Sequence, residues 1–140
     1  MRVSGHYSTI LTPHRGCSSF PTCFCLFQLI LFPLHPLPPS LPPPECTFIL
    51  LDKSNSSSLP PSFSPSSMVG DVNLFFNDQD NDLSMAEIEI MIAEPTARGR
   101  GMGKEGVGMM MQHAVETLGV KRFYCKISGG NEASLRMFEG

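Results

Sequence analysis

The sequence lacks several patterns that would assign it quickly to a class of protein. Its five cysteines contain no C-x-x-C pair, which argues against a zinc site and against a dithiol redox site. The best candidate for a membrane span, residues 23–34, is interrupted by Gln28 and Pro33 and falls short of the roughly 20 apolar residues that a bilayer requires. No convincing small-residue cleavage site follows it, so we do not expect a secretory signal. We expect a cytoplasmic protein without a membrane, metal or nucleic-acid partner.

Glycine is scarce in the first half of the chain, and proline is scarce in the second. Twelve of the 13 prolines lie at or before Pro65, and ten of the 12 glycines lie at or after Gly70. Between residues 18 and 67 roughly three residues in four are Phe, Leu, Pro or Ser, and that many prolines leave no helical or strand period. We therefore expect residues 1–67 to be a low-complexity, disordered segment and residues 68–140 to form the folded domain.

The folded part is organised around residues 86–103, AEIEIMIAEPTARGRGMG. At its start, isoleucines alternate with other residues: Ile88, Ile90 and Ile92 fall on one face, and Glu87, Glu89 and Met91 fall on the other. This period of two is typical of a strand, and Pro95 ends it. Three glycines follow, directly before apolar residues at helical spacing. The pattern predicts a strand, a glycine-rich turn and a helix over residues 104–118.

A glycine-rich turn that enters a helix is a physical device for binding phosphate. Glycine lets the backbone approach a ligand, and the helix dipole adds about half a positive charge at that end. A Walker loop requires Ser or Thr after its lysine, whereas Glu105 follows Lys104. The dinucleotide fingerprint can be laid on these glycines, but it requires an acidic residue about twenty positions later, where Lys121 and Arg122 stand. Neither pattern therefore fits the turn.

The spacing Arg98-x-x-Gly101-x-Gly103 resembles the R/Q-x-x-G-x-G/A signature of the GNAT acetyltransferases. Downstream, residues 121–127 are typical of another strand, and residues 131–138 resemble the N-x-x-A/S-x-x-x-Y/F helix of the same superfamily. The order of strand, turn, helix, strand and Asn-started helix is more specific than any one part. Within the superfamily, residues 68–139 are similar to the N-acetyltransferase 9-like proteins.

This resemblance implies an α/β fold of the GNAT type, a mixed sheet with flanking helices, and acetyl-coenzyme A (acetyl-CoA) as cofactor. The cofactor is expected at the end of the strand, along the turn and at the start of the last helix. The residues expected to bind it are Ile92, Ala93, Arg98, Gly99, Arg100, Gly101, Met102, Gly103, Lys104, Asn131 and Ser134. On its own chemistry, Asn131 is also a good N-cap for a helix.

The implied reaction is transfer of an acetyl group to a protein amine, in the first instance an N-terminal α-amino group, with a tubulin-like acceptor suggested by the resemblance. A protonated amine cannot attack a thioester, so a base must deprotonate it. Glu87 is the first candidate, because it lies eleven residues before Arg98, where some histone-type members carry their base; Glu89 is the second. Partial burial, and two like charges about 7 Å apart, would raise one pKa. The alternative is a pair of solvent-facing glutamates.

The chain departs from the family in two respects. The position of the tyrosine that protonates the departing thiolate in many members holds Phe138. A complete domain is also about twice the length of residues 68–140, and we expect residues 1–67 not to supply the missing strands. The alternative function is therefore a non-catalytic fragment that binds coenzyme A weakly or does not fold by itself. We expect no measurable turnover from this chain.

Overall fold

The computed structural model describes residues 6–11, 23–26, 45–52, 54, 65–77, 80 and 82–139. Its strands form one sheet in the order β1-β6-β5-β4-β3-β2. The strands are β1 (His6–Leu11), β2 (Cys23–Leu26), β3 (Glu45–Asp52), β4 (Met68–Phe75), β5 (Met85–Ile92) and β6 (Arg122–Ser128). The helical segments are η2 (Pro65–Ser67), η3 (Pro95–Ala97), α1 (Met102–His113), the π-helical turn η4 (Ala114–Leu118) and α2 (Glu132–Glu139).

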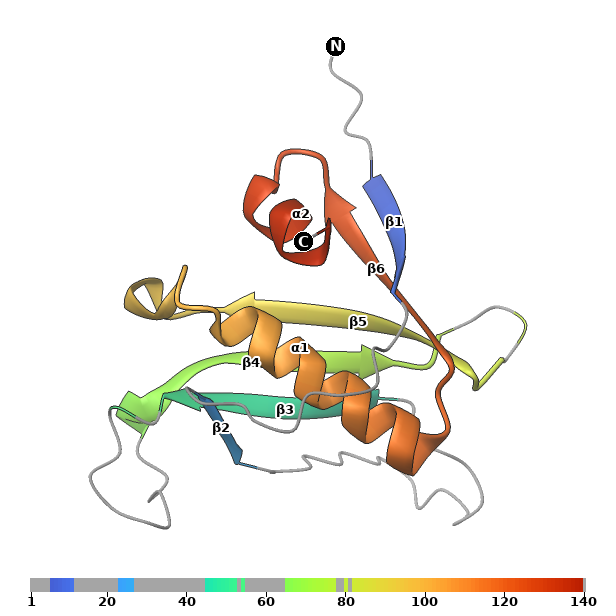
Figure 1. Ribbon diagram of the computed structural model, residues 1–140, viewed down its shortest axis with the longest axis horizontal. Coiled ribbons are helices and arrows are strands. Elements are labelled where there is room, and N and C mark those ends of the chain that lie inside the picture. Colours follow the sequence, from blue (N-terminus) through green and yellow to red (C-terminus); the bar gives the residue numbers. More distant parts are fainter. Residues whose placement is uncertain are drawn as a thin grey trace.

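The sheet is mixed, because β5 and β6 run parallel while the other neighbouring strands run antiparallel. Helix α1 crosses one face of β3, β4 and β5, and α2 lies near β6 (Figure 1). A parallel pair needs a long crossover, and the segment from β5 through α1 to β6 provides it. The expected α/β fold, a mixed sheet with flanking helices, is confirmed.

The core lies between α1 and the sheet. Alternate residues of the strands point into it, which is why the period of two predicted their faces correctly. The buried side chains include Phe48, Leu50, Val72, Leu74, Ala86, Ile88, Phe123, Cys125 and Ile127 from the sheet and Met102, Val107, Met110 and Ala114 from the helical segment. Burying one such large aliphatic or aromatic side chain contributes about 1.5–3 kcal/mol to folding.

The expected disorder of residues 1–67 is wrong for β3. Residues 45–52 contain no proline, and they begin directly after Pro44, where the proline run ends. Phe48 and Leu50 point into the core, and β3 pairs with β4 from Glu45↔Phe75 to Leu51↔Met68. The proline-rich average of the surrounding window concealed this short strand. The backbones of β1 and β2 pair with β6 and β3, so residues before Met68 do supply strands to the sheet.

The predicted helix over residues 104–118 is confirmed, with two refinements. Helix α1 begins at Met102, and its end continues as the π-helical turn η4. Gly119 has φ 74°, a left-handed conformation that ends the helix. Gly106 lies against β3, where an added Cβ would meet Leu50 Cδ2 at 2.8 Å. No helix in the described ranges is long and apolar enough to cross a bilayer.

Candidate functional site

The turn between β5 and α1 is built by local backbone chemistry. Pro95 starts the short helix η3, and the carboxylate of Glu94 caps it by accepting a hydrogen bond from the Thr96 N–H at 3.2 Å. The chain then passes through Gly99 at φ 71° and Gly101 at φ 84°. L-residues rarely adopt these conformations, so both positions favour glycine. The glycines thus shape the turn as the sequence predicted.

Arg98 holds the turn against the end of β5. Its Nε donates to the Ile92 carbonyl oxygen at 2.9 Å, and its Nη2 donates to the Ala93 carbonyl oxygen at 3.3 Å. Its backbone N–H donates to the Pro95 carbonyl oxygen. Arg98, Ile92 and Ala93 were all expected to bind the cofactor, and the structure brings the three together. In this arrangement the guanidinium of Arg98 orients the turn.

Among the described residues, no side chain caps the N-terminus of α1. Gly101 is its N-cap and provides no side-chain hydrogen bond. The N–H of Glu105 donates to the Gly101 carbonyl oxygen, whereas the amides of Met102, Gly103 and Lys104 precede the first partner that a helix can offer. Within the part of the chain that the structure describes, a Cβ added at Gly99 or at Gly101 would meet nothing within 4 Å. Free donors, the positive end of a helix and open space beside the glycines suit a phosphate.

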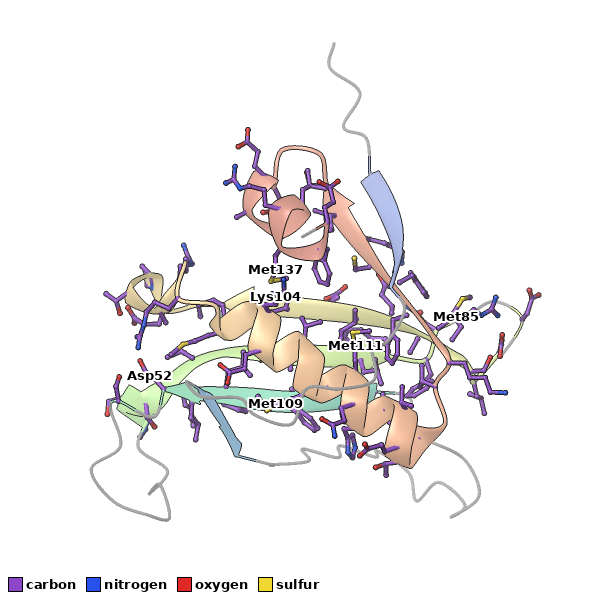
Figure 2. The ribbon with its side chains drawn as sticks, in the orientation of Figure 1. Asp52, Met85, Lys104, Met109, Met111 and Met137 are labelled. Atoms are coloured by element: carbon purple, nitrogen blue, oxygen red, sulfur yellow. The ribbon has the colours of Figure 1, made fainter. Side chains whose placement is uncertain are left out.

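The side chains around this N-terminus differ in what they can contribute. Met102 is buried, so its backbone alone is available, while the ammonium-bearing Lys104 is exposed. Gly103 faces α2: a Cβ there would come within 3.1 Å of Met137 Sδ. Figure 2 shows Lys104 and Met137 in the region where α1 and α2 approach one another. Glycine at 103 therefore permits the close approach of the two helices.

The strands β5 and β6 separate beside the turn. They pair at Met85↔Arg122, Ala86↔Phe123 and Glu87↔Tyr124. Beyond that point β5 continues to Ile92 with β4 on its other edge, and within the described residues no strand pairs with the edge that faces β6. Figure 1 shows the two strands splaying apart, with α1 starting near the far end of β5. We call the place where β5 and β6 separate, beyond the pair Glu87↔Tyr124, the fork. The fork exposes backbone donors and acceptors with which an extended amide-containing ligand can pair.

Asn131 and Ser134 lie at the start of α2, where the sequence predicted a cap. The Asn131 Oδ1 accepts a hydrogen bond from the Ser134 N–H at 3.1 Å. The Asn131 carbonyl oxygen accepts one from the Leu135 N–H at 3.0 Å. The predicted role of Asn131 as an N-cap is confirmed, and a contact with a cofactor stays a prediction. Phe138, which replaces the family's tyrosine, packs against the core.

The two candidate bases lie on the face of β5 away from α1, in different surroundings. Glu89 is exposed, but the side chain of Glu87 is only 3% exposed. Its Oε2 accepts hydrogen bonds from Lys126 Nζ at 2.7 Å and from Asn77 Nδ2 at 2.9 Å. The Tyr124 hydroxyl in turn donates to Asn77 Oδ1 at 2.7 Å. Glu87 thus belongs to a polar network at the fork.

This network corrects the expected pKa of Glu87. Burial raises the pKa of Glu87, as the sequence argument supposed, but the hydrogen bonds from Lys126 and Asn77 and the charge of Lys126 outweigh burial and hold the pKa below its usual value. The hydrogen bond to Glu87 raises the pKa of Lys126, and the charge of Glu89 adds to that rise. Glu87 and Lys126 therefore form an ion pair at neutral pH. The expected raised pKa of Glu87 is wrong because its cationic partner could not be seen in the sequence.

The turn also has a partner that the sequence argument missed. Arg100 Nη1 forms an ion pair with Asp52 Oδ2 at 2.6 Å, and Asp52 is the last residue of β3. A signal did exist, because the proline-free run of residues 45–52 ends in this aspartate. Because the composition was averaged over residues 18–67, this short run was counted as low-complexity sequence, and both the strand and the contact were missed.

Comparison with known proteins agrees with this geometry. The acetyltransferase (GNAT) domain family matches residues 49–140. Alpha/beta-tubulin-N-acetyltransferase 9 of Homo sapiens is 50% identical over 95 residues, which cover 68% of this chain and 45% of that protein. An N-acetyltransferase 9-like protein of Nematostella vectensis is 54% identical over 94 residues, which cover 67% of this chain and 46% of that protein. The chain thus spans about half the length of the curated relatives it matches.

Solved structures share the fold. A domain from Methanocaldococcus jannaschii superposes with a TM-score of 0.52 at 25% identity, covering 69% of this chain and 54% of that chain. Spermidine N-acetyltransferase from Vibrio cholerae, solved in complex with CoA and spermine, superposes with a TM-score of 0.52 at 19% identity. The match covers 69% of this chain and 48% of that chain. The residues of the turn, the sheet order and these similarities agree, and the chain belongs to the GNAT acetyltransferase family.

Proposed function

We propose that this chain binds acetyl-CoA and serves the transfer of its acetyl group to a protein amine, specifically an N-terminal α-amino group, in the cytoplasm. The observation that carries the proposal is the turn 98–101, which Arg98 holds at the end of β5 and which delivers open backbone amides at the start of α1. Membership of the GNAT family supports acetyl-CoA as the ligand.

The residues present fit this cofactor. The amides of Met102, Gly103 and Lys104 would receive the pyrophosphate, since they have no acceptor within the helix. The edge of β5 beyond Glu87, with which no described strand pairs, would receive the amide-containing arm of the cofactor. The cofactor would supply an acetyl thioester. The described side chains would orient the cofactor and accept the proton that the amine loses.

Of the two candidate bases, Glu89 is now favoured for the proton. Glu87 is ion-paired with Lys126, and its lowered pKa makes it a weaker proton acceptor. Glu89 stands on the same face of β5, is exposed and carries no such partner at hydrogen-bond distance among the described residues. In this arrangement Glu87 acts as a positioning residue that fixes Lys126, and Glu89 takes the proton from the amine.

Support for a tubulin acceptor comes from the relatives. The matched proteins of Homo sapiens, Mus musculus and Drosophila melanogaster are named alpha/beta-tubulin-N-acetyltransferase 9. They are 43–50% identical to this chain over 68% of its length. A protein acceptor related to tubulin is therefore the first to test.

The test is a calorimetric titration of the full chain with CoA. Saturable binding is expected, and its absence would overturn the proposal. A second arm incubates the chain with acetyl-CoA and peptides that carry the N-termini of α- and β-tubulin, and fragments the products by mass spectrometry. Acetyl found on the α-amine supports the proposed acceptor, whereas acetyl found on lysine side chains alone would contradict it.

A further inference from the structure

Asp52 is a buried charge at the end of β3, and it is fully engaged. Its side chain is 3% exposed. Oδ1 accepts hydrogen bonds from the Ser54 N–H at 2.9 Å and from the Ser54 hydroxyl at 2.6 Å, while Oδ2 accepts one from Arg100 Nη1 at 2.6 Å. Three donors on one carboxylate fix its position, and a buried carboxylate persists in a fold when it is paired in this way.

Arg100 is held on one side and open on the other. Its side chain is 45% exposed although it forms the ion pair with Asp52. A guanidinium has five N–H donors in a rigid plane, and for its Nε and Nη2 no acceptor is found in the part of the chain that the structure describes. Arg100 immediately precedes the N-cap Gly101, so its side chain leaves the backbone one residue before the start of α1.

The placement joins two segments that are far apart in the sequence. Asp52 and Arg100 are separated by 48 positions. Figure 2 places Asp52 at the end of the sheet where the turn enters α1. A carboxylate this close to an anion site would repel phosphate if it were unpaired. Pairing with Arg100 removes that repulsion and fixes the direction of the remaining donors.

We propose that Asp52 is a positioning residue for the cofactor: it holds the guanidinium of Arg100 beside the N-terminus of α1, where the open donors of Arg100 contact a phosphate group. This inference rests on the proposed binding of acetyl-CoA and adds to it a residue outside the glycine-rich turn. Asp52 itself touches no ligand. It acts through Arg100, so its effect on affinity requires that arginine.

The experiment is a double-mutant cycle in the full chain, with CoA affinity measured by calorimetry. Asp52→Asn keeps the shape of the side chain and removes its charge, and it is expected to weaken CoA binding about tenfold. Arg100→Gln is expected to weaken binding by a similar factor or more. In the Arg100→Gln background, Asp52→Asn is expected to cause no further loss, because it acts only through Arg100, and removal of the then unpaired negative charge should leave the affinity equal or higher. A merely structural role would lower affinity equally in both backgrounds.

Asp82→Asn is the control, because it removes the acid of another ion pair, Asp82–Arg122 at 2.7 Å, in the turn before β5. It should leave CoA affinity unchanged. If Asp52→Asn does not fold by circular dichroism, Ser54→Ala takes its place in the cycle, since it removes one of the three donors to Asp52. Loss of affinity that disappears in the Arg100→Gln background supports the inference.

The failures can be told apart. If the unmodified chain does not bind CoA, the proposed function fails and this inference falls with it. If the unmodified chain binds CoA and Asp52→Asn, or Ser54→Ala in its place, binds equally well, the proposed function stands and the role of Asp52 is overturned. An equal loss of affinity with and without Arg100 would also overturn it.

Discussion

Replacing Gly101 with alanine separates the strain of the turn from its capacity to bind a ligand. Gly101 has φ 84°, and Gly119, at the other end of the helical segment, has φ 74°. An added Cβ meets nothing within 4 Å at either position. Both alanine variants should therefore incur the same backbone cost, about 1–2 kcal/mol for an L-residue in the left-handed region. For a small domain this lowers Tm by roughly 4–8 °C per kcal/mol.

The two variants should differ in cofactor binding. Gly101 is the N-cap of α1, so if a phosphate binds to the amides that follow it, a methyl group at Gly101 is expected to crowd that phosphate. Loss of that contact should weaken CoA binding by about tenfold or more, equivalent to at least about 1.4 kcal/mol. Gly119→Ala should leave the affinity unchanged. The assays are thermal denaturation by circular dichroism and calorimetric titration with CoA.

One result would refute this reasoning. If Gly101→Ala and Gly119→Ala show the same loss of Tm and the same affinity for CoA, the turn is a strained connection between a strand and a helix with no part in binding. Gly101→Val then serves as a second check, because a β-branched side chain fills more of the same space.

Three further outcomes are expected. In a turnover assay on a restored, longer domain, Glu89→Gln should lower kcat about a hundredfold or more if Glu89 is the base, whereas Glu87→Gln should lower it less; the reverse order would restore Glu87 as the base. Because the folded pKa of Glu87 lies below its unfolded value of about 4.3, its ion pair with Lys126 stabilises the fold above that pH and is lost as the pH falls through the folded pKa. Glu87→Gln should therefore flatten the acid limb of a plot of unfolding free energy against pH, and an unchanged limb would contradict the ion pair. Gly106→Ala should destabilise the fold in urea denaturation, because a Cβ that meets Leu50 in the packed core costs about 1–3 kcal/mol, more than the gain of about 1 kcal/mol in helix propensity; a stabilising effect would mean that Leu50 moves aside freely.

The parts of the fold that local patterns encode could be predicted. The alternation over residues 86–92, the glycines of the turn and the helical spacing after them each act over a few residues, and the structure has β5, the turn and α1 there. Asn131 as an N-cap and Gly119 as a helix end follow from the same short-range chemistry. These features depend on neighbours within about one turn, so the sequence shows them directly.

Strand β3 and the charge partners could not be predicted in the same way. The eight residues of β3 lie inside a proline-rich window that concealed their short proline-free run, and they become a strand by pairing with β4. The cationic donors to Glu87 and Asp52, which are Lys126 and Arg100, lie 39 and 48 positions further along the chain. Whether a glutamate on a strand has a raised or a lowered pKa depends on such partners, and they are fixed only when the sheet has formed.

The two buried carboxylates suggest how the site divides its work. Asp52 and Glu87 are each 3% exposed, and each binds a cation that is about half exposed, Arg100 at 45% and Lys126 at 54%. Such a pair fixes the cation in place and leaves part of it accessible, but it also keeps the carboxylate ionised and weakly basic. A carboxylate in this state is suited to positioning and poorly suited to accepting a proton from an amine. If the proposed proton transfer takes place at the fork, it requires a group outside the ion pairs, and among the described residues of the β5 face Glu89 is the candidate.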